Sequence, residues 1–350
     1  MVTEDKNRRP EKLHPLAGFS AGWLFLISKL TAGGVVALGF GSYMQRFFPA
    51  LDIRWTATTA LLFLVIANLA GIKKAGLLNR IIVSITLLSL IYFIFSGFAV
   101  FDAGNFQPFF ISSGWGGVAQ ASGVLFFAFT GYARIATLGE EVDEPQKNIP
   151  RAIIITLISS VILYSLVSLV ALGAIGAEGM SESGTPLFSA AEAMTWPAVL
   201  QIIMISGTTA LLGVLLSQIL GTSRMFYAMG QRRDLPQLLS HVSKGSGVPT
   251  YGILLSGLVF LLAIWTGELT FITQTASFTI LIYYSIANLS AMRLEDEDHF
   301  LPRWIPWAGL ILCILMAFSL PLPSILAGLS LLLAGHLLRL IFRAYSQPSP

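Results

Sequence analysis

Long apolar runs, separated by short charged or Pro/Gly-rich segments, repeat along the whole chain of 350 residues. A helix needs about 20 consecutive apolar residues to cross a hydrocarbon layer about 30 Å thick. By that measure the pattern predicts ten membrane-spanning helices. No stretch alternates as a barrel strand would, so we expect an all-α transmembrane helical bundle. The predicted spans lie near residues 17–43, 55–72, 81–100, 118–138, 150–175, 198–222, 249–266, 270–291, 304–320 and 322–342.

Charged residues are scarce, and their placement orients the predicted bundle. Only 11% of the residues are charged, against about 25% in a soluble domain, which excludes an ordinary soluble enzyme, a disordered tail and a nucleic-acid binder. All but three of the 21 Lys and Arg residues fall on one side of the predicted spans, leaving Arg46 and Arg54 on the other side and Lys29 inside a span. Positive residues concentrate on the cytoplasmic side. Both termini are therefore expected in the cytoplasm and the protein in the plasma (inner) membrane.

Two segments do not fit a span. Residues 1–16 are polar and charged, without the apolar core of a signal peptide. Residues 223–243 mix Met, Phe, Tyr and Leu with Arg and Asp. Part of this second segment is predicted to form an amphipathic helix at the cytoplasmic surface.

Lys29 lies in the interior of the predicted span 17–43, at position 13 of its 27 residues, and is the only lysine inside a predicted span. A charge at that depth costs at least about 2.5–3.5 kcal/mol on insertion scales, and a lysine stem cannot reach water from the middle of the layer. One interpretation is a lysine satisfied by backbone carbonyls or by the end of a neighbouring helix. The other is a residue of the transport pathway, and Lys29 is our candidate for coupling.

The predicted span 118–138 is interrupted midway by Thr130 and Gly131. An unwound backbone inside a bundle exposes N–H and C=O groups that can hold a polar ligand, but glycine in a membrane helix also serves close packing. Glu140 and Glu141 follow the span and oppose the helix dipole there. Arg224, at the end of a later span, is a candidate to compensate them, and a solvated loop is the alternative. Glu140, Glu141 and Arg224 are our candidates for a cytoplasmic gate.

The sequence contains little that suggests catalysis. Cys313 is the single cysteine, the four histidines are scattered, and no GxxxxGK[ST] phosphate loop is present. We therefore expect no enzyme activity, no cofactor, no metal and no nucleic-acid partner. A membrane-embedded enzyme is a distant alternative, because it would need clustered His, Asp or Glu inside the bundle.

The segment FFAFTGYARIATLGEEVDEPQKNIPRAI, which starts at Phe126, resembles the sixth helix and following loop of the amino acid–polyamine–organocation permeases. The matching positions are 126–129, 131, 136–137, 140–141, 145 and 149–151. GFSAGW (18–23) is similar to the family's third helix, and NLAGIKKAGLLN (68–79) to its fourth-to-fifth connection. The segments 221–239 and 286–294 resemble the regions after its eighth and at the end of its tenth helix.

This resemblance implies a five-plus-five inverted repeat with the substrate near the bilayer midplane. The family's binding segment in its sixth helix falls on Phe127, Ala128, Phe129, Thr130 and Gly131, whose backbone would hold an amino-acid head group. The implied activity is secondary active transport of amino acids or related organic cations, including polyamine-like ones, coupled to H⁺ or Na⁺. The lysine that some proton-coupled members have in their fifth helix is replaced by Thr86 here.

The same resemblance implies that the family's first two helices have no counterpart in the chain, so that the first repeat is incomplete. The 350 residues are then expected not to transport alone, and the alternative is a non-transporting remnant or a subunit that needs a separate two-helix piece. The expected division is an N-terminal cytoplasmic segment 1–16, a remainder of the first repeat 17–100, a second repeat 118–291, two C-terminal spans 304–342 and a cytoplasmic tail 343–350.

Overall fold

The computed structural model describes residues 15–71, 75–108, 114–131, 143–243, 245–293 and 302–346. Within these ranges the chain is helical and contains no strand. Each of the ten predicted spans overlaps a helix in the described residues. The long helices are α1 (Pro15–Phe47), α2 (Ile53–Leu69), α3 (Ala75–Gly97), α4 (Gly114–Leu125), α5 (Pro145–Glu182), α7 (Val199–Gln231), α8 (Thr250–Thr266), α9 (Leu269–Ala291), α10 (Trp304–Phe318) and α11 (Leu322–Ser346).

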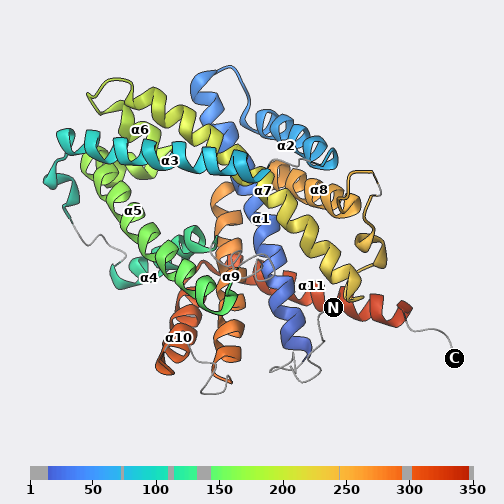
Figure 1. Cartoon of the computed structure of the whole chain (residues 1–350). Helices are drawn as coiled ribbons and strands as arrows, with labels where there is room; N and C mark the ends of the chain where they lie inside the picture. The colour runs from blue at the N-terminus through green and yellow to red at the C-terminus, as the bar shows by residue number, and fades with distance from the viewer. Residues whose placement is uncertain are drawn as a thin grey trace.

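Shorter elements connect these helices. They are α6 (Pro186–Glu192) and the 3-10 helices η1 (Phe98–Val100), η2 (Ala103–Phe106), η3 (Phe126–Phe129) and η5 (Gln237–Ser240). Six helices are long and apolar enough to cross a membrane, and four shorter apolar helices accompany them. Together they form the predicted α-helical bundle (Figure 1).

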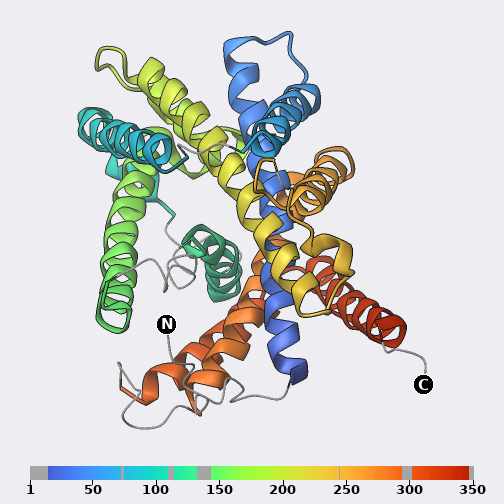
Figure 2. The ribbon, with the colours of Figure 1, turned by 45° about the vertical axis from the view of Figure 1, so that its right-hand side comes forward.

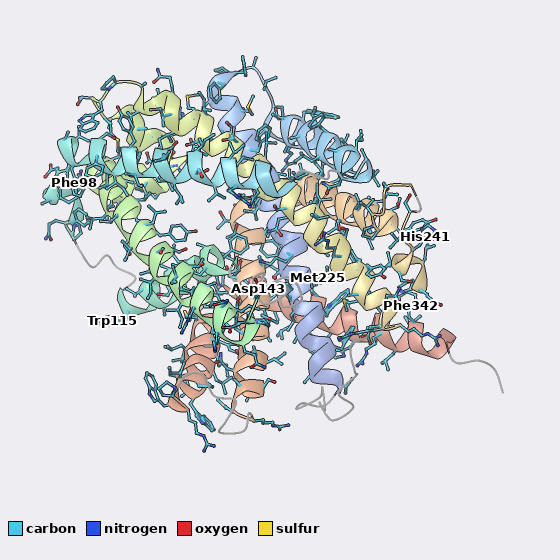
Figure 3. All side chains as sticks on the ribbon, viewed as in Figure 1. Phe98, Trp115, Asp143, Met225, His241 and Phe342 are labelled. Carbon is cyan, nitrogen blue, oxygen red and sulfur yellow. The ribbon has the colours of Figure 1, made fainter. Side chains whose placement is uncertain are left out.

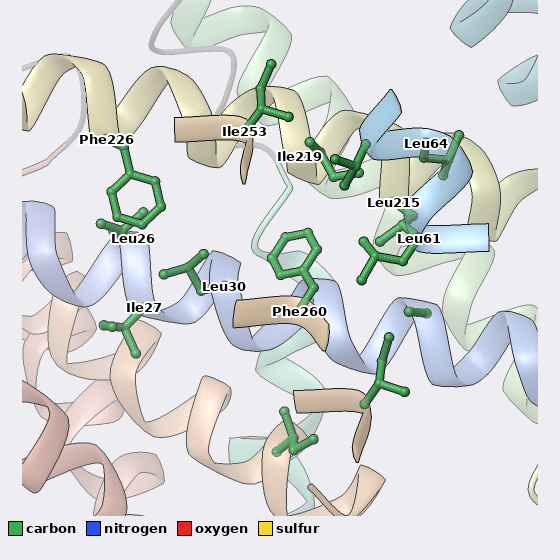
Figure 4. Close-up of a cluster of buried hydrophobic side chains, with 14 of the residues drawn as sticks. Leu26, Ile27, Leu30, Leu61, Leu64, Leu215, Ile219, Phe226, Ile253 and Phe260 are labelled. Atoms are coloured by element: carbon green, nitrogen blue, oxygen red, sulfur yellow. The ribbon is translucent and has the colours of Figure 1, made fainter. Parts of the chain in front are cut away.

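Helix α1 lies at the centre of the bundle and contacts α2, α7, α8, α9 and α11 (Figures 1 and 2). Leu26 and Leu30 of α1 meet Phe226 of α7 and Phe260 of α8 in the main hydrophobic core (Figure 4). A Cβ at Gly33 would lie 2.2 Å from the Phe260 ring. Glycine at this position therefore lets α8 approach the backbone of α1.

A second apolar cluster joins α3, α5, α6 and α7 on another side of the molecule, around Phe93, Val170 and Ile203. At its edge the backbone N–H of Asp102 and the side-chain amide of Asn105 both donate to the Gly173 carbonyl, at 3.0 and 2.8 Å. Gly176 has a φ of 70°, which a side chain would strain. These contacts hold the later half of α5 against the segment after α3.

Large apolar side chains project outward from the bundle. Phe98 and Trp115 lie at the periphery in Figure 3, and their side chains are exposed, as are Phe63 and Ile155. In water such a surface would drive association. In a bilayer it is the surface expected to face lipid, which agrees with the membrane class predicted from composition.

Two local predictions differ from the structure. Residues 223–231 do not form a separate surface helix, because α7 continues unbroken through them and buries Phe226 and Met229. A turn and the short η5 follow. The seven-residue helix α6 was not predicted, and α5 is longer at both ends than the predicted range 150–175.

Candidate transport site

The predicted binding segment coincides with a break in helical geometry. α4 ends at Leu125, and the next four residues, Phe126–Phe129, form the 3-10 helix η3. The Thr130 hydroxyl donates to the Phe127 carbonyl at 2.9 Å, and the Thr130 N–H donates to the same oxygen at 3.3 Å. A 3-10 turn is frequent at the end of an α-helix and also occurs at functional hinges, and residues 132–142 that follow are not described.

Gly131 follows this break directly. No described atom lies within 4 Å of the place where a Cβ would stand on Gly131. Both interpretations of this glycine, local unwinding and close helix packing, stay predictions, because residues 132–142 beyond it are not described. Thr130 is buried, Phe127 and Phe129 are half-buried, and Ala128 and Gly131 are exposed.

Lys29 of α1 reaches this break from 101 positions earlier in the chain. Its Nζ lies 3.2 Å from the Thr130 carbonyl oxygen and 3.4 Å from the Thr130 hydroxyl oxygen. The ammonium also lies 5.2 Å from the centroid of the Phe25 ring, one helical turn before it. The lysine is thus satisfied by a neighbouring helix end, and that end is part of the predicted binding segment.

Aromatic rings from three elements surround this contact. The ring of Phe25 in α1 lies 5.1 Å from that of Tyr283 in α9, and Tyr283 lies 4.9 Å from Tyr284. Tyr284 in turn lies 5.3 Å from Phe126 of η3. These centroid distances are those of favourable edge and tilted ring pairs. We call Phe25, Tyr283, Tyr284 and Phe126 the aromatic chain, which links α1, α9 and the break.

Helix α9 carries hydroxyl groups on the same face as Tyr283. Thr275, Thr279 and Tyr283 recur every four residues and so share one face of the helix, and Tyr283 shows that this face is turned to α1. The Thr275 hydroxyl is buried and has no hydrogen-bond partner among the described residues. Ser277, on another face, lies 3.4 Å from the Val124 carbonyl oxygen and connects α9 to α4.

The proposed gate is only partly described. Glu140 and Glu141 lie outside the described residues. Arg224 is exposed on α7, so the predicted compensation between these charges stays a prediction.

A buried ion pair that was not predicted lies apart from this site. Arg339 of α11 donates to Asp234, after α7, at 2.9 Å, and its guanidinium stands 4.6 Å from the Phe19 ring of α1. His336 lies 3.0 Å from the hydroxyl of Ser20. These contacts fasten α11 to α1 and to the turn after α7. The pair could not be predicted from the sequence, because 105 residues separate Arg339 from Asp234.

The aromatic chain was the part of the site that sequence reasoning missed. Neither the contact of Phe25 with Tyr283 nor that of Tyr284 with Phe126 was predicted. The available signal was the spacing of Phe25 and Lys29, which places them on one face of α1. Within the described residues, no group of three His, Cys, Asp or Glu side chains is arranged to hold a metal ion.

Comparison with known proteins agrees with this architecture. Residues 11–331 match the family described as "Amino acid permease". "Uncharacterized transporter Rv1999c" of Mycobacterium tuberculosis is 36% identical over 323 residues, which cover 91% of this chain and 72% of the relative. "Branched-chain amino acid permease BcaP" of Bacillus subtilis is 25% identical over 94% of this chain and 77% of its own. "Methylthioribose transporter" of the same organism is 25% identical over 88% of this chain and 72% of its own. The chain therefore belongs to the amino acid permease family of membrane transporters and is not an enzyme.

Proposed function

We propose that this protein is a secondary active transporter that moves amino acids or related organic compounds across the plasma membrane by alternating access. Family membership supports transport, and one relative is named for branched-chain amino acids and another for methylthioribose. The proposed orientation, with both termini in the cytoplasm, is supported by the uneven distribution of Lys and Arg.

The contact between Lys29 and Thr130 is the observation that best supports this proposal. It joins α1 to the irregular backbone at which the substrate head group would bind, with Phe127, Ala128, Phe129 and Gly131 supplying the rest of the segment. Irregular backbone at membrane depth is tolerated where it lines a cavity or is buried in protein. The aromatic chain supplies rings beside this segment.

Lys29 is the proposed coupling residue. As an ammonium it donates to the Thr130 carbonyl and hydroxyl. Loss of a proton would weaken both contacts, because charge-assisted hydrogen bonds are about twice as strong as neutral ones. Deprotonation of Lys29 would therefore weaken the attachment of the break to α1, and protonation would restore it. The proposed coupling ion is H⁺ or Na⁺, and Glu140, Glu141 and Arg224 are proposed to form the cytoplasmic gate.

The test is uptake of a panel of labelled amino acids by proteoliposomes in two preparations. One contains this chain alone, and the other adds the part of the mycobacterial relative that the match leaves uncovered. We expect saturable, substrate-specific uptake in at least one preparation, and its absence from both would contradict the proposal. In the preparation that transports, Lys29→Met should reduce uptake at least tenfold and flatten its dependence on pH, while an unchanged rate and pH profile would contradict the role of Lys29.

A second candidate is a chain that transports only together with further membrane helices. It is favoured by α5, of whose apolar window only 6% is buried, against 67% for α1. Ile155, Ile158 and Ile162 are exposed around the early part of α5. In a membrane either lipid or added helices could cover this surface, and uptake only in the supplemented preparation supports the second candidate. Uptake by the chain alone contradicts it.

A further inference from the structure

The turn that ends α7 has an arginine where glycine is usual. The backbone N–H of Asp234 donates to the Met229 carbonyl at 3.0 Å, and that of Arg233 donates to the Gly230 carbonyl at 3.0 Å. These two bonds form a Schellman motif, whose left-handed position is most often glycine. Arg233 occupies that position with a φ of 57°. A side chain there costs conformational energy that glycine avoids, so the geometry of the turn does not explain the arginine.

The same turn sends opposite charges in opposite directions. Asp234 is buried and accepts a hydrogen bond from Arg339 at 2.9 Å. Arg232 and Arg233 are exposed, and within the described residues their guanidinium groups form no hydrogen bond or ion pair. Asp234 is also the single acidic residue between positions 193 and 267. The two arginines therefore present positive charge that no carboxylate of this segment neutralises.

Exposed apolar and aromatic side chains lie at the same end of the bundle. Leu238 of η5 and Val242 after it are exposed, and so is Tyr251 at the start of α8. The Tyr251 ring lies 5.8 Å from that of His241, which is at the edge of the molecule in Figure 3. η5 contacts both α7 and α8, which places these residues around one turn. Basic residues combined with exposed aliphatic and aromatic ones are typical of segments that lie in a membrane interface.

The length of α7 agrees with this location. Residues 199–223 are uncharged and long enough to cross the hydrocarbon layer. The whole helix has 33 residues, or about 50 Å, and the layer is only about 30 Å thick. The last turns of α7 and the turn after it are therefore expected at the level of the lipid headgroups.

We propose that the turn 231–243 binds anionic phospholipids of the adjoining leaflet. Arg232 and Arg233 contact the headgroup phosphate, for which the planar guanidinium is well suited, and Leu238 and Val242 enter the boundary between headgroups and acyl chains. Each basic residue near an anionic membrane surface strengthens the attraction by about fivefold. This binding surface is separate from the transport site and does not depend on the identity of the substrate.

The experiment measures which lipid gathers at this turn. In a Cys313→Ala background, a bimane fluorophore is attached to Gln237→Cys, an exposed position of η5. The protein is reconstituted in a fixed mixture of phosphatidylcholine and phosphatidylglycerol, with bromine in the chains of one lipid or of the other. The ratio of the two quenching efficiencies gives the preference for phosphatidylglycerol. We expect a preference of at least about threefold, which falls when salt screens the charges.

Two single variants test the arginines. Arg232→Gln and Arg233→Gly should each lower the preference severalfold, and Arg233→Lys should keep most of it. Arg233→Gly should also melt at the same temperature or higher, because glycine adopts the φ of 57° without strain. Arg54→Gln is the matched control, because it removes the same charge from an exposed arginine that donates to the Trp265 carbonyl. It should leave the preference unchanged.

Three results would overturn the inference. The first is equal quenching by the two brominated lipids in the wild type. The second is an undiminished preference in the double variant Arg232→Gln/Arg233→Gly. The third is loss of the preference when millimolar glycerol 3-phosphate is added, because the arginines would then bind free phosphates instead of a lipid surface. Transport plays no part in the measurement, so each of these results leaves the proposed function standing.

Discussion

Helices α1 and α5 are both long and apolar, yet they lie in opposite surroundings. α1 contains a lysine and is the more buried, with contacts to α2, α7, α8, α9 and α11. α5 has the most apolar window of the six long spans and is the least buried of them. The comparison teaches that apolar length identifies a span but not its surroundings. In α1, Lys29, Gly33 and Gly34 lie at contacts with other helices, whereas α5 is exposed although it contains Ser159 and Ser165.

The largest expected effect concerns two ion pairs. One is buried beside Phe19 of α1, and the other is exposed at the start of α5. Asp234→Ala leaves the Arg339 guanidinium buried without its carboxylate, so the free energy of unfolding should fall by about 3–5 kcal/mol. Glu144→Ala breaks the exposed pair with Lys147 at the start of α5 and should cost less than about 1 kcal/mol. Thermal unfolding in one detergent measures both, and similar losses would contradict the difference between the regions.

Truncation of apolar side chains gives the next effect. Leu26→Ala opens a cavity in the main core, where Leu26 is 0% exposed, and should cost about 2–5 kcal/mol. Ile158→Ala removes a side chain from α5 that is 56% exposed and should change stability by about 0.5 kcal/mol or less. Denaturation in mixed micelles measures the free energy of unfolding of both variants. A loss at Ile158 as large as that at Leu26 would show that the α5 face is packed in the chain alone.

A smaller effect is expected from added methyl groups on α1. Gly33→Ala would place a Cβ within 2.2 Å of the Phe260 ring and should cost about 1–3 kcal/mol through overpacking. Gly18→Ala is the control, since no described atom lies within 4 Å of its added Cβ. Equal melting temperatures for the two variants would argue against close contact of α1 with α8.

Cysteine labelling gives the last prediction, because it tests the exposure of the two helices directly. In a Cys313→Ala background, Ile158→Cys should react with a maleimide in micelles at least about tenfold faster than Leu26→Cys, because reactivity follows exposure of the thiol. Comparable rates would contradict the burial assigned to the two helices. In the supplemented preparation, protection of the cysteine at Ile158 would indicate that added helices cover α5.

The hydrophobic pattern predicts the long helices because each spans the apolar layer alone. It does not predict α6, whose seven residues are too few for a periodic signal. It also ends α7 too early, since Arg224 resembles an exit from the membrane although Phe226 and Met229 beyond it are buried. The neighbours of α5 are not encoded in its hydropathy at all.

For the candidate site too, single residues could be predicted from the sequence, whereas their contacts could not. Lys29 could be singled out because a charge in a span is costly, and the break at Thr130 because glycine follows it and because the segment resembles a known binding helix. Their contact could not be predicted, since 101 residues separate them and only tertiary packing brings them together. The same holds for the aromatic chain, whose members come from α1, α9 and η3.

The most direct test of the central claim is a double-mutant cycle on uptake with Lys29→Met, Thr130→Val and the double variant. If Lys29 acts through its contact with the break, the two substitutions remove one shared interaction. The double variant should then transport about as well as the poorer single variant, with a coupling energy of at least about 0.5 kcal/mol. If the two reductions in uptake simply multiply, Lys29 and Thr130 act independently, and the account of the site is contradicted.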